Sequence, residues 1–166
     1  MLTSHELFGF MSPALASDIL DYTFTAEKEL YRATLHAVAQ ARKLRPVFLE
    51  RQARAERHPT MIATLSRPAQ ELVAANLIRS WLMKKHTALL IDFLDALGIA
   101  HQQGAVEDLP PAMDDAKLRI AIDALLARHP PEVVAVYLNA FSAMNDSGWT
   151  NLGEMLKNDP RLQLGG

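Results

Sequence analysis

The sequence predicts an all-α protein, a compact bundle of about six to eight helices with one long central helix. Apolar residues recur at spacings of three and four in almost every stretch between prolines or glycines, and no stretch alternates apolar with polar residues for more than a few positions. The chain has 166 residues, of which 49% are hydrophobic and 22% charged, and it contains no cysteine. A chain of this size can form a core without disulfides, so we expect one domain spanning residues 1–166.

The start of the first long helix is marked by a capping residue. Ser12 can accept a backbone N–H there, and Pro13 suits the first helical position because its missing N–H would have no partner in any case. Ahead of it lies an apolar N-terminal arm, residues 1–11. We expect this arm either to dock on its own bundle or to pack against a second copy or a partner chain. Its candidate contact residues are Leu7, Phe8 and Phe10.

A helix predicted over residues 46–57 has little apolar surface to bury. After Leu49 every residue in it is polar or alanine, so we expect it to project into solvent or to cover another element with its side-chain stems. Three of its arginines recur every three residues and would therefore lie on one side of the helix. The candidate partner-binding arginines in and before this helix are Arg42, Arg45, Arg51, Arg54 and Arg57.

The charge distribution allows two interpretations of the basic segment 42–67. Residues 28–85 hold 12 Lys or Arg against four Glu, whereas residues 86–166 hold five bases against 11 acids, and the whole chain has a net charge of −2. Either the basic middle pairs with the acidic ends inside one fold, or it exposes a surface that attracts an acidic partner or a nucleic acid. Aromatic residues are scarce in the segment, which disfavours stacking on single-stranded bases.

The longest helical pattern covers residues 68–97 and is the predicted central helix. At 1.5 Å per residue it would be roughly 45 Å long. A charged run ending at His86 interrupts its apolar residues and allows a kink there, but no proline or glycine requires one. Gly98 suits the left-handed cap position at the end of this helix, and Ile99 can fold back onto it.

Turn-forming residues make 100–111 the longest irregular connection of the predicted fold. Asp114 can cap the helix that follows, and Pro131 opens the next one. A short last helix is expected over residues 149–156. Residues 160–166 are predicted to be a flexible tail.

The residue patterns of common cofactor and metal sites are missing. The six histidines are all at least 15 residues apart, so no helix can present two of them on adjacent turns to one metal ion. Neither a phosphate-binding glycine pattern nor the Gly-x-Ser-x-Gly turn of hydrolases is present. We expect no metal and no cofactor, and the pattern favours a protein that is not an enzyme.

An enzyme stays open as an alternative, with His86 and His101 as the candidate pocket residues. His86 lies on an apolar stripe of the predicted central helix, where a partly buried imidazole could accept a proton. The same position equally suits a histidine that pairs with a backbone or carboxylate group in the core.

No membrane association is expected, because the longest aliphatic run, residues 88–91, is far too short to cross a bilayer. No Lys or Arg precedes the apolar residues of the amino terminus, so we expect no secretory signal and a cytoplasmic location. Together these observations predict a helical interaction or scaffold protein that associates with itself or with a protein partner. The alternative is nucleic-acid or polyanion binding through the basic segment 42–67.

Overall fold

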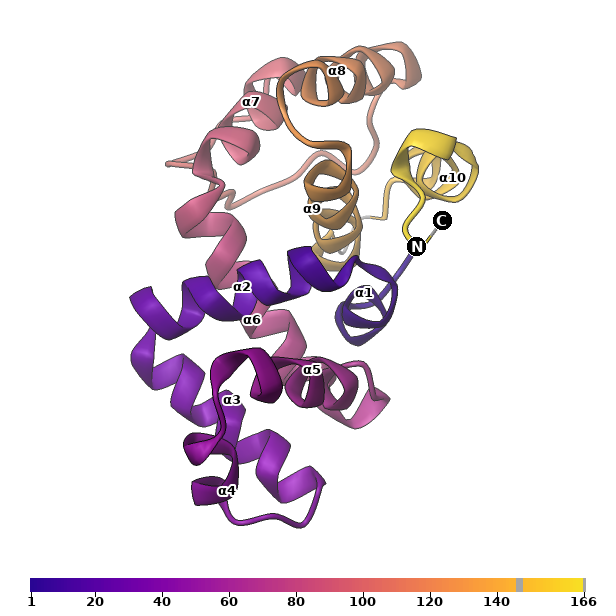
Figure 1. Ribbon diagram of the computed structural model, residues 1–166. Helices are drawn as coiled ribbons and strands as arrows, with labels where there is room; N and C mark the ends of the chain where they lie inside the picture. The colour runs from indigo at the N-terminus through magenta and orange to yellow at the C-terminus, as the bar shows by residue number, and fades with distance from the viewer. Residues whose placement is uncertain (146–147, 166) are drawn as a thin grey trace. The chain divides into compact units, whose positions relative to one another are not determined.

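The chain consists of helices and their connections. A computed structural model describes residues 1–145 and 148–165 (Figure 1). These residues form ten α-helices and two short 3₁₀ helices, and none of them belongs to a β-strand. The elements are α1 (Ser4–Phe10), α2 (Pro13–Ala26), α3 (Lys28–Ala41), α4 (Pro46–Arg51), α5 (Arg54–Leu65), η1 (Pro68–Gln70), α6 (Glu71–Lys85), α7 (Thr87–Leu97), α8 (Asp115–Arg128), α9 (Pro131–Met144), α10 (Thr150–Asn158) and η2 (Pro160–Leu162).

The all-α fold class predicted from the sequence is confirmed, but the predicted count of six to eight helices is too low. The apolar arm 1–11 folds into α1. The predicted helix over residues 46–57 is divided between α4 and α5, and the predicted central helix over 68–97 is divided among η1, α6 and α7. The divisions occur where neither proline nor glycine marks them.

Contacts within the chain define two compact units. One contains Thr3–Trp81, and we call it the α1–α5 unit; the other contains Met1–Leu2 and Leu82–Leu164, and we call it the α7–α10 unit. The boundary between the two units falls inside α6. A single cooperative domain over residues 1–166 stays a prediction.

Local signals start the α1–α5 unit as the sequence predicts. Ser12 Oγ accepts the N–H of Leu15 at 3.2 Å, and Pro13 occupies the first position of α2. The arm ahead of it docks on its own unit, because α1 packs against α5 and buries Leu7 and Phe8. This outcome is one of the two that the sequence left open.

Glu71 fixes the amino-terminal end of α1. Its carboxylate accepts the backbone N–H groups of Ser4 and His5, each at 2.8 Å, and it also contacts the His5 ring. A negative charge at this end complements the helix dipole. Burial raises the pKa of the Glu71 carboxyl, but the hydrogen bonds from His5 and Ser4 outweigh that effect and leave the pKa below its ordinary value.

The break between α4 and α5 is stabilised by a side chain from the following helix. Gln52 and Ala53 both have extended backbone conformations, with ψ of 146° and 147°. At this end of α4 the Leu49 carbonyl accepts the Gln52 N–H at 3.2 Å. The Nη1 atom of Arg57 also donates to the carbonyls of Leu49 and Glu50, at 3.3 and 3.4 Å. A cation at a helix carboxyl terminus is also favoured by the dipole.

The α7–α10 unit is organised by the caps that the sequence predicts. Gly98 has φ of 71°, and the Ile99 N–H donates to the Leu94 carbonyl at 2.9 Å, which completes the expected left-handed cap of α7. Asp114 caps α8 by accepting the Lys117 N–H at 3.0 Å. The core of this unit includes a set of aromatic rings in mutual contact: Phe93, Tyr137, Phe141 and Trp149.

The prediction of one long central helix is wrong at His86. This residue leaves the helical conformation, with φ of −115° and ψ of 34°, so that α6 ends at Lys85 and α7 begins at Thr87. The Thr87 hydroxyl donates to the Met83 carbonyl at 2.6 Å. This bond satisfies a carbonyl in the last turn of α6, and it compensates for the interrupted helix.

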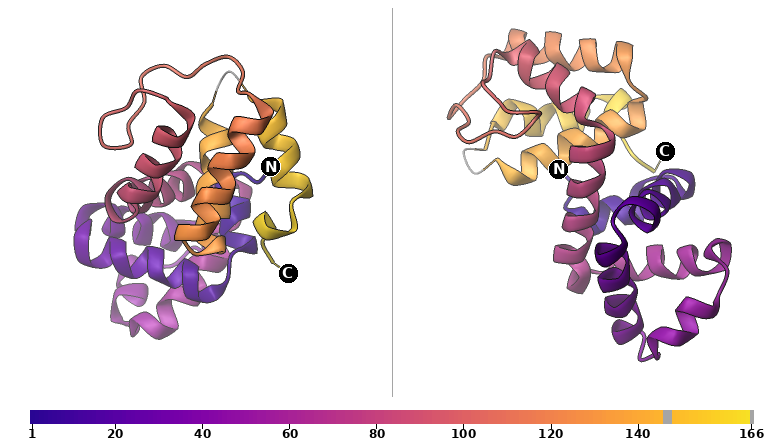
Figure 2. Two further views of the ribbon diagram at one scale, coloured as in Figure 1. Left: turned by 90° about the horizontal axis from the view of Figure 1, so that it is seen from above. Right: turned by 90° about the vertical axis from the view of Figure 1, so that its left-hand side faces the viewer.

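The connection between α7 and α8 is irregular, as predicted for residues 100–111, and Figure 2 shows its long course. Gln102 and Ala105 form an isolated bridge in it. The predicted flexible tail over residues 160–166 is wrong for its first part, because η2 is a folded turn whose Leu162 is buried. Gly166 lies outside the described residues.

Candidate functional site

The turn between α3 and α4 forms the candidate contact surface. We call it the basic tip and define it as residues 42–48 together with Arg51. At the end of α3, Lys43 adopts a left-handed conformation with φ of 57°, and the Leu44 N–H donates to the Ala39 carbonyl at 2.8 Å. Pro46 then opens α4, which lies beside α3 (Figure 1). A lysine in this conformation costs roughly 1–2 kcal/mol, so the surrounding turn must hold it.

Apolar side chains are exposed on the basic tip. Phe48 is 60% exposed, and its neighbours Leu44 and Val47 are also exposed. The next residue of the same short helix, Leu49, is buried and attaches α4 to the unit. Consecutive helix residues are about 100° apart around the axis, so Phe48 can be exposed while Leu49 contacts the core.

The same surface carries cations that have no acidic partner. Among the described residues, no carboxylate lies within ion-pair distance of Arg42, Lys43, Arg45 or Arg51. Arg42 donates to the Thr64 hydroxyl at 3.4 Å, a contact that leaves its charge uncompensated. The tip therefore combines an exposed aromatic ring with four exposed positive charges.

Arg54 and Arg57 do not belong to this surface, and the predicted row of three arginines on one helix side is wrong. The break at residues 52–53 separates Arg51 from the other two. Arg54 pairs with Asp21 at 3.6 Å, and its guanidinium lies 4.4 Å from the centre of the Phe24 ring. Part of the basic segment is thus compensated by the acidic amino-terminal region.

Arg57 is 6% exposed, which is unusual for an arginine. Its guanidinium lies 5.4 Å from the centre of the Tyr31 ring, and its bonded partners are the two carbonyls at the end of α4. A buried charge requires compensation, and here carbonyl dipoles and an aromatic face supply it. Arg57 therefore positions α4 and is not available to a partner.

Beside Arg57, three polar side chains lie in a row. The Nε2 atom of His58 lies 2.9 Å from the Tyr31 hydroxyl, and its Nδ1 atom lies 3.5 Å from the Asp21 carboxylate. Burial lowers the pKa of His58, because it disfavours the protonated ring, and burial raises the pKa of Tyr31. Both Tyr31 and His58 are enclosed, so the row does not present a reactive atom to a substrate.

Of the arm residues proposed for partner binding, the structure exposes only one. Leu7 and Phe8 are buried within the α1–α5 unit, whereas Phe10 is exposed to about half of its surface. A contact through Leu7 or Phe8 would require α1 to leave α5. Phe10 alone offers a ready surface.

The two candidate pocket histidines have different surroundings. His86 is partly buried at the junction of α6 and α7. His101 accepts the Gly104 N–H at its Nδ1 atom, at 3.1 Å, so its Nε2 atom carries the proton and donates to Asp95 at 2.7 Å. This pair holds the irregular connection to α7, which suits a structural role for His101.

A second His–Asp pair joins the end of α8 to α7. His129, at the end of α8, bonds to Asp92 at 2.9 Å. Asp92 and Asp95 lie three residues apart on α7, and each of them is engaged by a different histidine.

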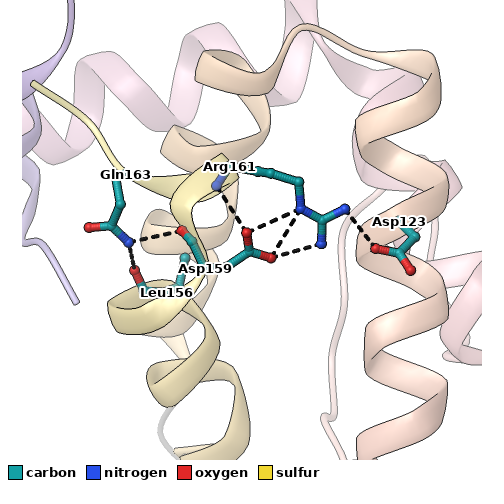
Figure 3. A network of polar contacts seen from close by, with 5 residues as sticks. All are labelled: Asp123, Leu156, Asp159, Arg161 and Gln163. Atoms are coloured by element: carbon teal, nitrogen blue, oxygen red, sulfur yellow. Dashed lines mark hydrogen bonds and ion pairs between the residues drawn. The ribbon is translucent and has the colours of Figure 1, made fainter. Parts of the chain in front are cut away.

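Sequence analysis did not identify the polar network around Arg161, which lies in a cleft of about 530 Å³ between α8 and α10. The Arg161 guanidinium binds the carboxylates of Asp123 and Asp159 at 2.9 and 2.8 Å, as Figure 3 shows. Hydrogen bonds from Arg161 lower the pKa of Asp159, and those to Asp159 and Asp123 raise the pKa of Arg161. The three charges compensate one another and attach η2 to α8.

Neither this cleft nor a second one in the same unit is lined by His86 or His101. Within residues 1–145 and 148–165, no three His, Asp or Glu side chains gather as ligands for a metal ion. The helices of the described part of the chain are all too short or too polar to cross a membrane.

Comparison of the chain with protein-family models, with curated proteins and with solved structures finds no match. The surfaces of the chain itself, the basic tip above all, therefore indicate its function.

Proposed function

We propose that the chain is a non-enzymatic interaction protein that associates with itself, and that the basic tip is its contact surface. The single observation that carries this proposal is the exposure of Phe48, Leu44 and Val47 in a segment whose four cations are also exposed. An apolar centre with a polar rim is the usual arrangement of protein interfaces. An aromatic residue exposed in this way is favoured as a binding hot spot.

The structure of the tip supports a contact role over a purely solvated one. Lys43 is held in a left-handed turn and Arg57 fixes the end of α4, so the exposed side chains are presented on an ordered backbone. Binding then costs less conformational entropy than it would for a loose loop. The patch is small, so we expect a weak and reversible association.

Sedimentation velocity over a range of protein concentrations tests this function. We expect the average mass of the wild-type protein to rise with concentration and that of Phe48→Ser to rise much less. Leu72→Ser is the matched control, because Leu72 is even more exposed, at 75%, and lies outside the tip in the same unit. A wild-type protein that stays monomeric throughout, or a Phe48→Ser variant that associates normally, contradicts the proposal.

Polyanion binding through the tip is the second candidate function, and the four unpaired cations favour it. Its support is weaker, because Arg54 and Arg57 of the basic segment are engaged within the unit. It predicts that a labelled DNA duplex binds the protein with an affinity that falls steeply as salt rises, and that Arg45→Glu with Arg51→Glu abolishes the binding. Arg79→Glu, which alters an exposed arginine on α6, is the control.

A further inference from the structure

We propose that the basic tip of one copy inserts Phe48 into a hollow beside the α7–α8 connection of a second copy, so that copies join head to tail. This inference rests on the proposed self-association and names the surface that receives the tip. Three features of the described residues lead to it: a preformed hollow with several apolar lining residues, exposed acids at residues 107–108, and the repulsion that two tips would experience.

The hollow lies in the α7–α10 unit, between the end of α7, the α7–α8 connection and the start of α8. Its volume is about 520 Å³, and pockets that accept ligands are roughly 300–1,000 Å³. Its apolar lining includes Ile99, Leu109, Pro110 and Met113, and its charged lining residues are Asp108 and Lys117. A single aromatic side chain is a suitable occupant for a shallow hollow whose lining is partly apolar.

Hydrogen bonds from α10 and its cap hold one wall of the hollow in place. The Trp149 indole N–H donates to the Pro110 carbonyl at 2.8 Å, and the Asn151 amide donates to the Met113 carbonyl at 2.8 Å. At the other side, the left-handed cap at Gly98 fixes Ile99 against α7. The connection is irregular, but its backbone is attached at both sides of the hollow, so the site exists before a partner arrives.

The charges around the hollow complement those of the tip. Residues 86–116 contain six acidic residues and no Lys or Arg. Four of the six are engaged: Asp92 and Asp95 with histidines, Asp114 as a helix cap, and Asp115 with Arg119.

The other two acids, Glu107 and Asp108, are exposed, and no ion pair reaches them from any described residue. Asp108 also lines the hollow itself. In the proposed contact, the exposed acids beside the hollow of one copy face the exposed cations beside Phe48 of the other. Opposite charges arranged in this way speed the encounter of the two copies and fix how the surfaces align. Lys117 is the one cation at the hollow, and its charge opposes the tip.

A symmetric contact between two tips is disfavoured by the same charges. It would bring the arginines and lysine of both tips together without an intervening acid except Glu50, which lies 4.0 Å from the His36 ring of its own chain. A contact between unlike surfaces avoids this repulsion. Because each copy would then offer one tip and one hollow, association does not stop at a dimer unless the chain of copies closes into a ring.

Mixing two complementary variants tests the head-to-tail contact. The first variant, Phe48→Ser with Arg45→Glu, loses the tip and retains the hollow. The second, Ala100→Trp with Asp108→Lys, fills and recharges the hollow and retains the tip; Ala100 is an exposed lining residue, so its replacement does not disturb the core. Circular dichroism checks that both variants are folded.

We expect each variant alone to be monomeric at concentrations where the wild-type protein forms larger species. We expect an equimolar mixture to form a one-to-one dimer and nothing larger, because only one intact tip and one intact hollow meet. The affinity in the mixture should equal that of one wild-type contact and weaken several-fold as salt rises.

Two results would overturn this inference while leaving self-association intact. In the first, the hollow variant alone associates as the wild-type protein does; in the second, the mixture stays monomeric. A wild-type protein that is monomeric at every concentration instead contradicts the proposed function itself. As a further arm, Arg45→Glu should associate with Asp108→Arg more tightly than with the wild-type protein, because the exchanged charges attract again.

Discussion

Arg57 in the α1–α5 unit and Arg161 in the α7–α10 unit both attach a short helical segment to the rest of their unit. Arg57 is buried and donates to two backbone carbonyls at the end of α4, with no carboxylate in its ion-pair shell among the described residues. Arg161 is about half exposed and is held by the two carboxylates of Asp123 and Asp159. The attachment made by Arg57 depends on its burial, and the attachment made by Arg161 depends on opposite charge.

The number of charged partners of an arginine is therefore a poor measure of how much that arginine stabilises the fold. Exposed ion pairs gain little because water already solvates both charges. A buried guanidinium has lost its water, so each carbonyl bond and each ring contact that it makes is hard to replace. We therefore expect the arginine with fewer charged partners to matter more.

The largest expected effect is that of Arg57→Ala. Removing the side chain leaves a cavity and takes away a donor from the Leu49 and Glu50 carbonyls, of which Leu49 keeps the Gln52 N–H. We expect the free energy of unfolding to fall by about 3 kcal/mol in urea denaturation. Arg57→Met is the matched control, because methionine fills most of the space and donates nothing. An Arg57→Met variant as stable as the wild-type protein would show that burying the charge costs as much as its hydrogen bonds contribute.

His58, in the same buried cluster as Arg57, should make the free energy of unfolding depend on pH. Burial lowers the pKa of His58 below its ordinary value of 6.5. The charges of Arg57 and Arg54 also lower it, whereas that of Asp21 opposes them. The unfolded chain therefore binds a proton more readily than the folded one. The stability from neutral His58 is fully present above pH 6.5 and is lost as the pH falls through the folded-state pKa.

We expect His58→Gln to flatten the dependence of unfolding free energy on pH below about pH 6.5, as measured by urea denaturation at several pH values. One titrating group can contribute a slope of at most about 1.4 kcal/mol per pH unit. Glutamine retains a polar partner for the Tyr31 hydroxyl, which limits the loss at pH 8. An unchanged slope in the variant would mean that other groups cause the pH dependence.

Several helix ends could be predicted from the sequence, because the residues that make them act locally. Ser12, Gly98 and Asp114 cap the predicted helices through bonds to neighbours three to five residues away in sequence. The breaks at residues 52–53 and 86 depend instead on compensation after the break. At the first break, Arg57 donates to the carbonyls at the end of α4, and at the second the Thr87 hydroxyl donates to the Met83 carbonyl. The residues at the breaks, 52–53 and 86, include no proline or glycine. The apolar spacing of the sequence therefore could not show that the helices are interrupted there.

The candidate site could be predicted only in part. The cations Arg42, Arg45 and Arg51 follow from charge counting as candidates, because residues 28–85 hold 12 Lys or Arg against four Glu. The burial of Arg57 does not, because the Tyr31 ring that covers it comes from a helix 26 residues earlier. The hollow beside the α7–α8 connection also requires tertiary structure, since its wall is held by Trp149 and Asn151.

The smallest expected effect is that of Arg161→Ala, although Arg161 has the more conspicuous ion pairs. Its carboxylate partners remain solvated when it is removed, and the Asp159 carboxylate still accepts the backbone N–H of residue 161 at 2.9 Å. We expect the free energy of unfolding to fall by no more than about 1 kcal/mol. Lys157→Ala, which removes an exposed cation from the end of α10, controls for the change in net charge.

Salt separates the contribution of charge at Arg161 from that of packing. At about 1 M salt the Debye length is roughly 3 Å, so the difference between Arg161→Ala and the wild-type protein should nearly vanish. The deficit of Arg57→Ala should persist under the same conditions, because the carbonyls and the cavity are buried. If Arg161→Ala instead lost as much stability as Arg57→Ala and the loss survived high salt, the burial of Leu162 in η2 would depend on this arginine. The contrast between buried and exposed arginines would then fail.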